Sequence, residues 1–162
     1  MHSATITILL LAALALALTT AAVTDARRRQ IDNWLNAAIA LAAPLFWLAS
    51  GLTLAAVGWQ VALAVGAFAV LTGLFAIGAM GGGDVKLLTA LALWVRPLWF
   101  MHLITVMAVA GGVLTVVLAM WHVARRDRQK VVVPYGIAIA AGGLWVMVAD
   151  CLPTLHAPAL LG

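Results

Sequence analysis

The sequence predicts an all-α integral membrane protein, a single domain built as a bundle of about six transmembrane helices. Of its 162 residues, 66% are hydrophobic and only 9% are charged, and the mean hydropathy is +1.15. Soluble domains are closer to half apolar and a quarter charged. In addition, residues 33–83 carry no charged side chain. Because one helical crossing takes about 20 residues, this stretch alone holds two spans.

The individual helices are predicted from the points where apolar runs are interrupted. The first run is followed by the basic residues 27–29 and has no basic segment before it, so a retained span is expected rather than a secretory signal. The segment SGLTLAAVGWQ, residues 50–60, contains glycines and polar residues and divides the uncharged stretch into two helices. The dipeptide Arg96-Pro97 ends the fourth helix, and Pro134 lies near the start of the last. The predicted helices cover residues 4–24, 34–53, 59–79, 84–95, 98–122 and 132–149.

The distribution of positive charge predicts the orientation of the bundle. With the N-terminus and the C-terminus both outside, eight Lys and Arg side chains fall on the inner face and Arg96 alone falls on the outer face. Cytoplasmic loops carry such an excess, so the pI near 10.3 needs no nucleic-acid partner. The inner-face set is Arg27, Arg28, Arg29, Lys86, Arg125, Arg126, Arg128 and Lys130. Five tryptophans near helix ends predict an aromatic belt, namely Trp34, Trp59, Trp94, Trp99 and Trp121.

Any carboxylate chemistry in this chain depends on five aspartates, because glutamate is absent. The predicted topology places Asp25 and Asp84 at the inner ends of the first and fourth helices, at similar depth. Asp127 is expected in an ion pair within a basic loop, and Asp150 lies at the opposite face. Asp32 belongs to the connector before the second helix, where it is expected to cap that helix. The single cysteine excludes an internal disulfide and a cysteine-based zinc site.

A glycine triplet followed by an aspartate, residues 81–84, suggests a specific chemistry. Two carboxylates brought close together share a proton, so one can activate water while the other polarises a peptide carbonyl. The glycines permit unusual backbone angles and the close approach of an extended substrate. Other interpretations remain open: an intramembrane aspartate can be a proton relay or a structural acceptor, and glycines can serve helix packing. Lys86 fits an inner-face anchor better than a catalytic role.

Two segments in the second half of the chain resemble motifs of the type IV prepilin peptidases. GGGDVKLL, residues 81–88, is similar to the GxGD-x-K-L motif of that family, with Gly81, Gly83 and Asp84 in the motif positions. VPYGIAIAAGGL, residues 133–144, is similar to the Pro-Tyr-Gly segment that opens the family's last helix.

A third segment, DARRRQIDNWLN at residues 25–36, resembles the first motif of the same family. In that motif an aspartate is followed by basic residues and then by Ile-Pro-Asn. Asp25 matches the aspartate, and Ile31 and Asn33 match two members of the triplet. Asp32 stands where the family has proline. The three motifs occur in the family's order, and together with the six predicted spans and their orientation they extend the resemblance over nearly the whole chain.

The resemblance implies a membrane-embedded aspartyl endopeptidase with Asp25 and Asp84 as its catalytic pair. Its substrate would be a prepilin or pilin-like precursor, cut before the hydrophobic segment at the cytoplasmic face of the bacterial inner membrane. The precursor and the lipid bilayer are the implied partners, and no cofactor, metal ion or nucleic acid is expected. Pro134, Tyr135 and Gly136 would either border the site or only start the last helix. Further motif or substrate-binding positions are Gly81, Gly82, Gly83, Lys86 and Asn33.

The length of the connector after the first predicted helix narrows the resemblance to one branch. Many members of the family carry an insertion there, often with paired CxxC motifs that bind zinc, and also methylate the new N-terminus. Here the connector has only about ten residues, so the chain resembles the short, peptidase-only enzymes of Flp (tight-adherence) pilus systems, without methyltransferase activity. The alternatives are a non-catalytic scaffold of a pilus assembly system and a small proton-coupled carrier, which would usually show an internal repeat.

Overall fold

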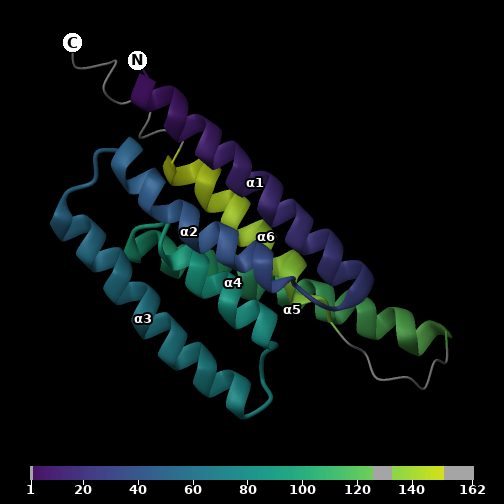
Figure 1. Ribbon diagram of the computed structural model, residues 1–162. Coiled ribbons are helices and arrows are strands. Elements are labelled where there is room, and N and C mark those ends of the chain that lie inside the picture. Colours follow the sequence, from purple (N-terminus) through teal and green to yellow (C-terminus); the bar gives the residue numbers. More distant parts are fainter. Residues whose placement is uncertain (1, 126–132, 152–162) are drawn as a thin grey trace.

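Six α-helices and no strand make up the described part of the chain, which is residues 2–125 and 133–151 of a computed structural model (Figure 1). The predicted all-α class with six helices is therefore confirmed. The helices are α1 His2–Arg28, α2 Asn33–Ala49, α3 Leu54–Ala76, α4 Gly82–Ala92, α5 Pro97–Arg125 and α6 Tyr135–Val146, which a π-helical segment, η1 Met147–Cys151, continues. The predicted ion pair of Asp127 and the predicted start of the last helix at residue 132 lie outside the described residues.

Glycine and threonine set the boundaries of α3. Gly51 takes a left-handed φ of +64° just after α2, and Gly78 takes +74° just after α3, a conformation that glycine adopts without strain. Thr53 is the N-cap of α3, and its side chain accepts a hydrogen bond from the Ala56 N–H at 3.2 Å. α3 therefore begins at Leu54 rather than at residue 59, and Gly58 lies inside the helix.

Three of the six helices, α1, α3 and α5, are long and apolar enough to cross a membrane. α4 has only 11 residues, which at 1.5 Å per residue spans roughly 16 Å, about half the thickness of the hydrocarbon core. The predicted number of helices, six, is thus confirmed. Of these six helices in the described part of the chain, only three are long enough to cross a membrane. The short helices α4 and α6 are the ones with the largest share of buried residues.

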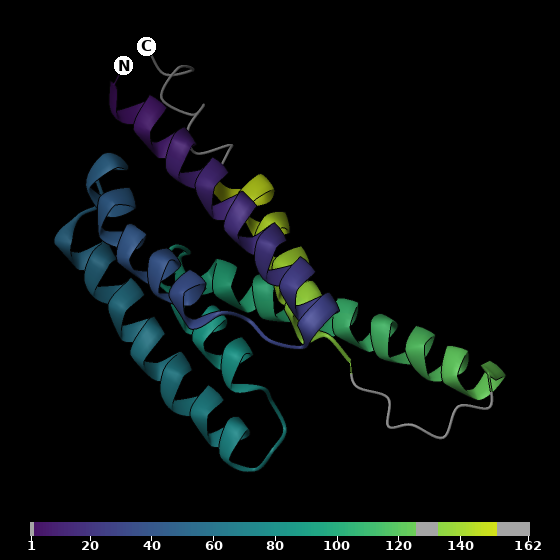
Figure 2. The ribbon, with the colours of Figure 1, turned by 45° about the vertical axis from the view of Figure 1, so that its right-hand side comes forward.

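The two short helices occupy the centre of the bundle. α4 packs against α2, α3 and α6, and α6 packs against α1, α4 and α5. Figures 1 and 2 show α3 along one edge and the C-terminal half of α5 projecting away from the other helices. Close approach of α6 depends on glycine, because a Cβ at Gly142 would lie 2.8 Å from the carbonyl oxygen of Leu103. A Cβ at Gly143 would lie 2.9 Å from Leu18 Cδ1.

Trp94 corrects the predicted aromatic belt. Its side chain is buried, its ring stacks on Phe46 with centroids 5.0 Å apart, and its Nε1 donates a hydrogen bond to the Ile39 carbonyl at 2.9 Å. The prediction was wrong for this residue because α4 is short and internal, so that its C-terminal end lies inside the bundle rather than at a lipid interface. The exposed members of the predicted belt include Trp34, Trp59 and Trp121.

Candidate active site

Asp25 lies in the last turn of α1, where the helix packs against the start of α6. Its side chain is 7% exposed, and its Oδ2 accepts a hydrogen bond from the Gly136 N–H at 2.7 Å. A Cβ at Gly136 would lie 2.8 Å from the Asp25 Cβ and 2.9 Å from its Oδ2. Only glycine therefore lets α6 approach this carboxylate so closely, and the contact fixes the direction in which the carboxylate points.

Asp84 lies in the first turn of α4, and its carboxylate folds back toward the residue that caps this helix. Gly81 is the N-cap of α4, and a Cβ there would lie 2.9 Å from Asp84 Oδ2. This corresponds to one half of a capping box, in which an acidic side chain three residues after the N-cap reaches back to the N-cap backbone. The Asp84 side chain is buried, so the sequence folds locally to hold a carboxylate at the edge of the protein interior.

A cavity of about 460 Å³ brings the two carboxylates together. The connector between α1 and α2 forms one side of it, and the glycine loop before α4 forms the other. Its lining residues are Asp25, Arg29, Gln30, Ile31, Asp32, Asn33, Gly81, Gly82, Gly83 and Asp84. The connector turns sharply because Arg29 takes a left-handed φ of +56°, which is unfavourable for a residue with a Cβ. The cavity thus combines residues from the first two motif segments of the sequence.

The charge of one aspartate acts on the other. Asp84 lies on α4, which is not one of the three helices long enough to cross a membrane. Burial, and then the negative charge of Asp25, raise the pKa of Asp84 to about 6, against a lowering by a hydrogen bond from the Gly81 backbone. Carboxylates coupled in this way hold and release protons as a pair. The arrangement can therefore keep one proton on Asp84 while Asp25 accepts the hydrogen bond from the Gly136 N–H.

Asn36 supports the glycine loop and was not anticipated from the sequence. It is buried in α2, and its Nδ2 donates a weak hydrogen bond to the Gly83 carbonyl at 3.4 Å. The Asn36 Oδ1 has no hydrogen-bond partner among the described residues. On the neighbouring side, a Cβ at Gly83 would lie 3.2 Å from Ile31 Cβ. The sequence did contain a sign of this role, because Asn36 is a second amide side chain about one helical turn after Asn33, in a helix that is otherwise mostly apolar.

Lys86 joins α4 to α2 rather than lining the carboxylate cavity. Its Nζ donates a hydrogen bond to Asn33 Oδ1 at 2.7 Å. Both residues line a second cavity of about 330 Å³ between α2, α3 and α4, together with Asn36 and Phe68. Asn33 belongs to both cavities. The polar cavity therefore continues toward a more apolar space beside the same two helices.

The residues of the Pro-Tyr-Gly segment, 134–136, have two roles: they begin α6, and one of them contacts Asp25. Pro134 is the N-cap of α6, and Gly136 contacts Asp25 as described. The Tyr135 ring lies against α5, where a Cβ at Gly111 would come within 3.1 Å of Tyr135 Cε1. The three residues do not line the carboxylate cavity formed by the described residues. The segment therefore starts α6 and, through Gly136, holds one carboxylate in place.

Asp32 and Asp150 behave differently from the two central aspartates. Asp32 is the N-cap of α2, as expected, but its side chain makes no capping hydrogen bond and instead lines the carboxylate cavity. Asp150 forms an ion pair with Arg96. Among the described residues, no group of three or more His, Cys and Asp side chains is placed to hold a metal ion.

The fold and this cavity define a class: a helical membrane protein that buries two aspartates beside a glycine loop. The chain belongs to the type IV leader peptidase family, because the model of that family matches residues 12–116, or 105 of the 162 residues. This result confirms the resemblance to the prepilin peptidases. The matched region includes Asp25, Asp84 and the glycine loop, and ends before α6. No curated protein and no solved structure matches the chain.

Proposed function

We propose that this chain is an aspartic-type endopeptidase that removes the leader of type IV prepilins of the Flp class, or of pilin-like precursors. The observation that carries the proposal is that Asp25 and Asp84 line one cavity, where burial and then the charge of Asp25 raise the pKa of Asp84. Membership of the type IV leader peptidase family supports a peptidase that acts on such precursors. Cleavage would occur at the cytoplasmic face of the bacterial inner membrane, just before the hydrophobic segment of the substrate.

The two carboxylates would share the work of hydrolysis. Asp25 accepts a proton from a water molecule, whose oxygen attacks the carbonyl carbon, while Asp84 gives its proton to the carbonyl oxygen. The tetrahedral intermediate collapses when Asp25 passes its proton to the amide nitrogen, the carbon–nitrogen bond breaks, and Asp84 recovers a proton from the hydroxyl group. The raised pKa of Asp84 supports its role as the protonated member. The hydrogen bond from the Gly136 N–H holds the Asp25 carboxylate in a fixed orientation in the site.

The shape of the site suits an extended peptide. Gly81, Gly82 and Gly83 present no side chains on one side of the cavity, so a substrate backbone can approach Asp84 closely. The more apolar neighbouring cavity, reached past Asn33, is placed to accept the start of the substrate's hydrophobic segment. α1 and α2 are joined by a short connector without an inserted domain, which supports a peptidase without methyltransferase activity.

A cleavage assay with matched aspartate variants tests the proposal. The chain is co-expressed with a candidate Flp-type prepilin, and mass spectrometry identifies the new N-terminus of the substrate. We expect cleavage by wild type, with an unmethylated product, and a loss of about 1,000-fold or more in Asp25→Asn and in Asp84→Asn, because each removes one partner of the proton exchange. Asp32→Asn is the control, since it neutralises a third carboxylate of the same cavity and should retain cleavage.

The outcomes separate the candidate functions. Near-wild-type cleavage by either Asp25→Asn or Asp84→Asn would show that the pair is not catalytic. If properly inserted wild type cleaved none of the prepilins tested, the non-catalytic scaffold or the proton-coupled carrier would replace the peptidase. A methylated product would contradict only the assignment to the peptidase-only branch.

A further inference from the structure

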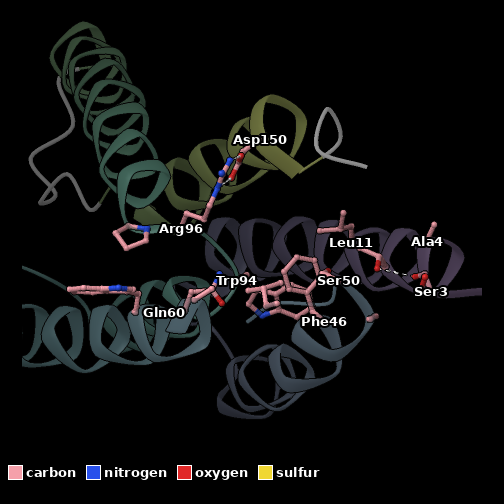
Figure 3. A pocket seen from close by; sticks show the side chains of 15 residues that line it. Ser3, Ala4, Leu11, Phe46, Ser50, Gln60, Trp94, Arg96 and Asp150 are labelled. Atoms are coloured by element: carbon pink, nitrogen blue, oxygen red, sulfur yellow. Dashed lines mark hydrogen bonds and ion pairs between the residues drawn. The ribbon is translucent and has the colours of Figure 1, made fainter. Parts of the chain in front are cut away.

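A third cavity lies at the end of the bundle away from the two aspartates (Figure 3). Its volume is about 750 Å³, and it is bounded by the first turns of α1 and α3, the end of α2 and the corner before α5. On α1, Thr7 lines this cavity and Asp25 lines the carboxylate cavity. The 18 residues between these positions correspond to roughly 27 Å of helix. The two cavities are therefore separate sites.

The walls of this cavity are mostly apolar and aromatic. Leu11 contributes from α1, and Phe46 stacks on Trp94 with ring centroids 5.0 Å apart. Figure 3 shows the Phe46 and Trp94 side chains next to each other on one wall. Cavities of about 300–1,000 Å³ with such walls hold small organic ligands. In a helical membrane protein, the apolar part of a ligand at this position is an acyl chain.

One buried polar atom in the wall has no partner. Gln60 of α3 is only 3% exposed, and its Oε1 accepts no hydrogen bond from any described residue. Buried polar atoms are nearly always hydrogen-bonded, so an exception needs an explanation. Gln60 lines the cavity, and an outside donor that enters the cavity would satisfy its Oε1. The ligand therefore carries an N–H or O–H group as well as an apolar chain.

A pair of opposite charges stands at the same cavity. Arg96, at the corner before α5, forms an ion pair with Asp150 of η1, and both residues line the cavity. Figure 3 shows the Arg96 side chain directed toward Asp150. The Arg96 side chain is 59% exposed and that of Asp150 is 7% exposed, so the guanidinium remains accessible. The exposed Arg96 side chain can attract a phosphate group, and the Gln60 Oε1 can accept a hydrogen bond from an N–H or O–H group of the same ligand.

We propose that this cavity binds a phospholipid with a primary-ammonium headgroup, as in phosphatidylethanolamine. The acyl chain lies along Leu11, Phe46 and Trp94, and the phosphate approaches the Arg96 guanidinium. The ammonium group donates a hydrogen bond to Gln60 Oε1. The lipid would join the ends of α1, α2 and α3 at the side of the bundle away from the peptidase site. This assignment does not depend on the proposed peptidase activity.

The test compares two lipids whose headgroups differ only at the nitrogen, which carries three hydrogens in one and three methyl groups in the other. Full-length protein is delipidated in detergent and titrated with phosphatidylethanolamine or phosphatidylcholine of identical acyl chains, and binding is followed by native mass spectrometry and thermal denaturation. The trimethylammonium group of phosphatidylcholine has no N–H, so we expect phosphatidylethanolamine to bind about tenfold more tightly. Gln60→Met keeps the size of the side chain and should abolish this preference. Gln30→Met, the same change at the other end of the molecule, should preserve it.

A blocking variant tests the location of the lipid. Ala49→Phe places a ring in the cavity and should remove stabilisation by both lipids. Equal binding of the two lipids by wild type, an unchanged preference in Gln60→Met, or tighter binding of phosphatidylglycerol than of phosphatidylethanolamine would each overturn the proposal. Repeating the titration with Asp84→Asn keeps the result independent of catalysis, because that variant should retain the full lipid preference.

Discussion

The short helix α6 and the long helix α3 are similarly apolar in sequence, and the short helix α4 is less apolar because it carries Asp84 and Lys86, but α3 differs from both short helices in what surrounds it. Seven of the 11 residues of α4 and seven of the 12 residues of α6 are buried. In α3 only three of 23 residues are buried. The long helix presents its side chains to the surroundings of the bundle, whereas the short helices are enclosed by protein. Both short helices contribute to the site. Asp84 lies on α4, and Gly136, which donates a hydrogen bond to Asp25 of α1, lies on α6.

Glycine shows what this difference means for packing. A Cβ added at Gly58, Gly66 or Gly73 of α3 would meet no atom within 4 Å. At Gly136 and Gly142 of α6 it would come within 2.8 Å of neighbouring atoms. The same residue type is thus required for contact in the internal helix and is replaceable in the peripheral one. Glycine substitutions on the two kinds of helix should therefore have opposite effects.

Among the glycine substitutions, the largest effect is expected for Gly136→Ala. The added methyl group would displace the Asp25 carboxylate, because it would lie 2.9 Å from Oδ2. A displacement of about 1 Å in a catalytic group can cost on the order of 100-fold in rate, and we expect a loss of that size in kcat/KM for prepilin cleavage. Gly112→Ala on α5, where a Cβ meets nothing within 4 Å, is the control. Full activity in Gly136→Ala would show that this contact does not position Asp25.

A smaller effect, on stability, is expected for Gly142→Ala. The new Cβ would lie 2.8 Å from the Leu103 carbonyl oxygen, and backbone atoms of α5 cannot move aside as a side chain can. Overpacking of this kind costs about 1–3 kcal/mol, which thermal denaturation in detergent would detect. Gly66→Ala on α3 should instead be neutral or slightly stabilising, because alanine favours the helix. Equal thermal midpoints for the two variants would remove the distinction between internal and peripheral helices.

The fold class could be predicted because it depends on composition and on where charges interrupt apolar runs. Both determine helix number without knowledge of packing. The pairing of Asp25 with Asp84 was also predictable, since the predicted topology placed the end of the first helix and the start of the fourth at the same face of the bundle. Gly136, Asn36 and the buried Trp94 act through contacts between residues 47 to 111 positions apart. Such contacts depend on which helices are internal, and the similar hydropathy of α3 and α6 does not reveal that.

The smallest expected effect is a pH dependence of stability that belongs to the aspartate of the internal helix. Burial and the charge of Asp25 raise the pKa of Asp84 from 3.8 to about 6. Between these values the folded protein binds more protons at Asp84 than the unfolded chain does, so the free energy of unfolding decreases as the pH rises from about 4 to about 6. Because Asp84 borders an open cavity, solvent screening keeps the effect below that of Gly142→Ala.

Thermal denaturation of wild type and Asp84→Asn across this pH range measures the effect. Asparagine does not titrate, so the variant should lose the decrease in stability between pH 4 and pH 6 that wild type shows. Asp32→Asn, which changes the partly exposed carboxylate at the start of α2, should keep the wild-type decrease. A decrease that persisted in Asp84→Asn and disappeared in Asp32→Asn would assign the coupled proton to the connector. The carboxylate on the internal helix would then not be the protonated member of the pair.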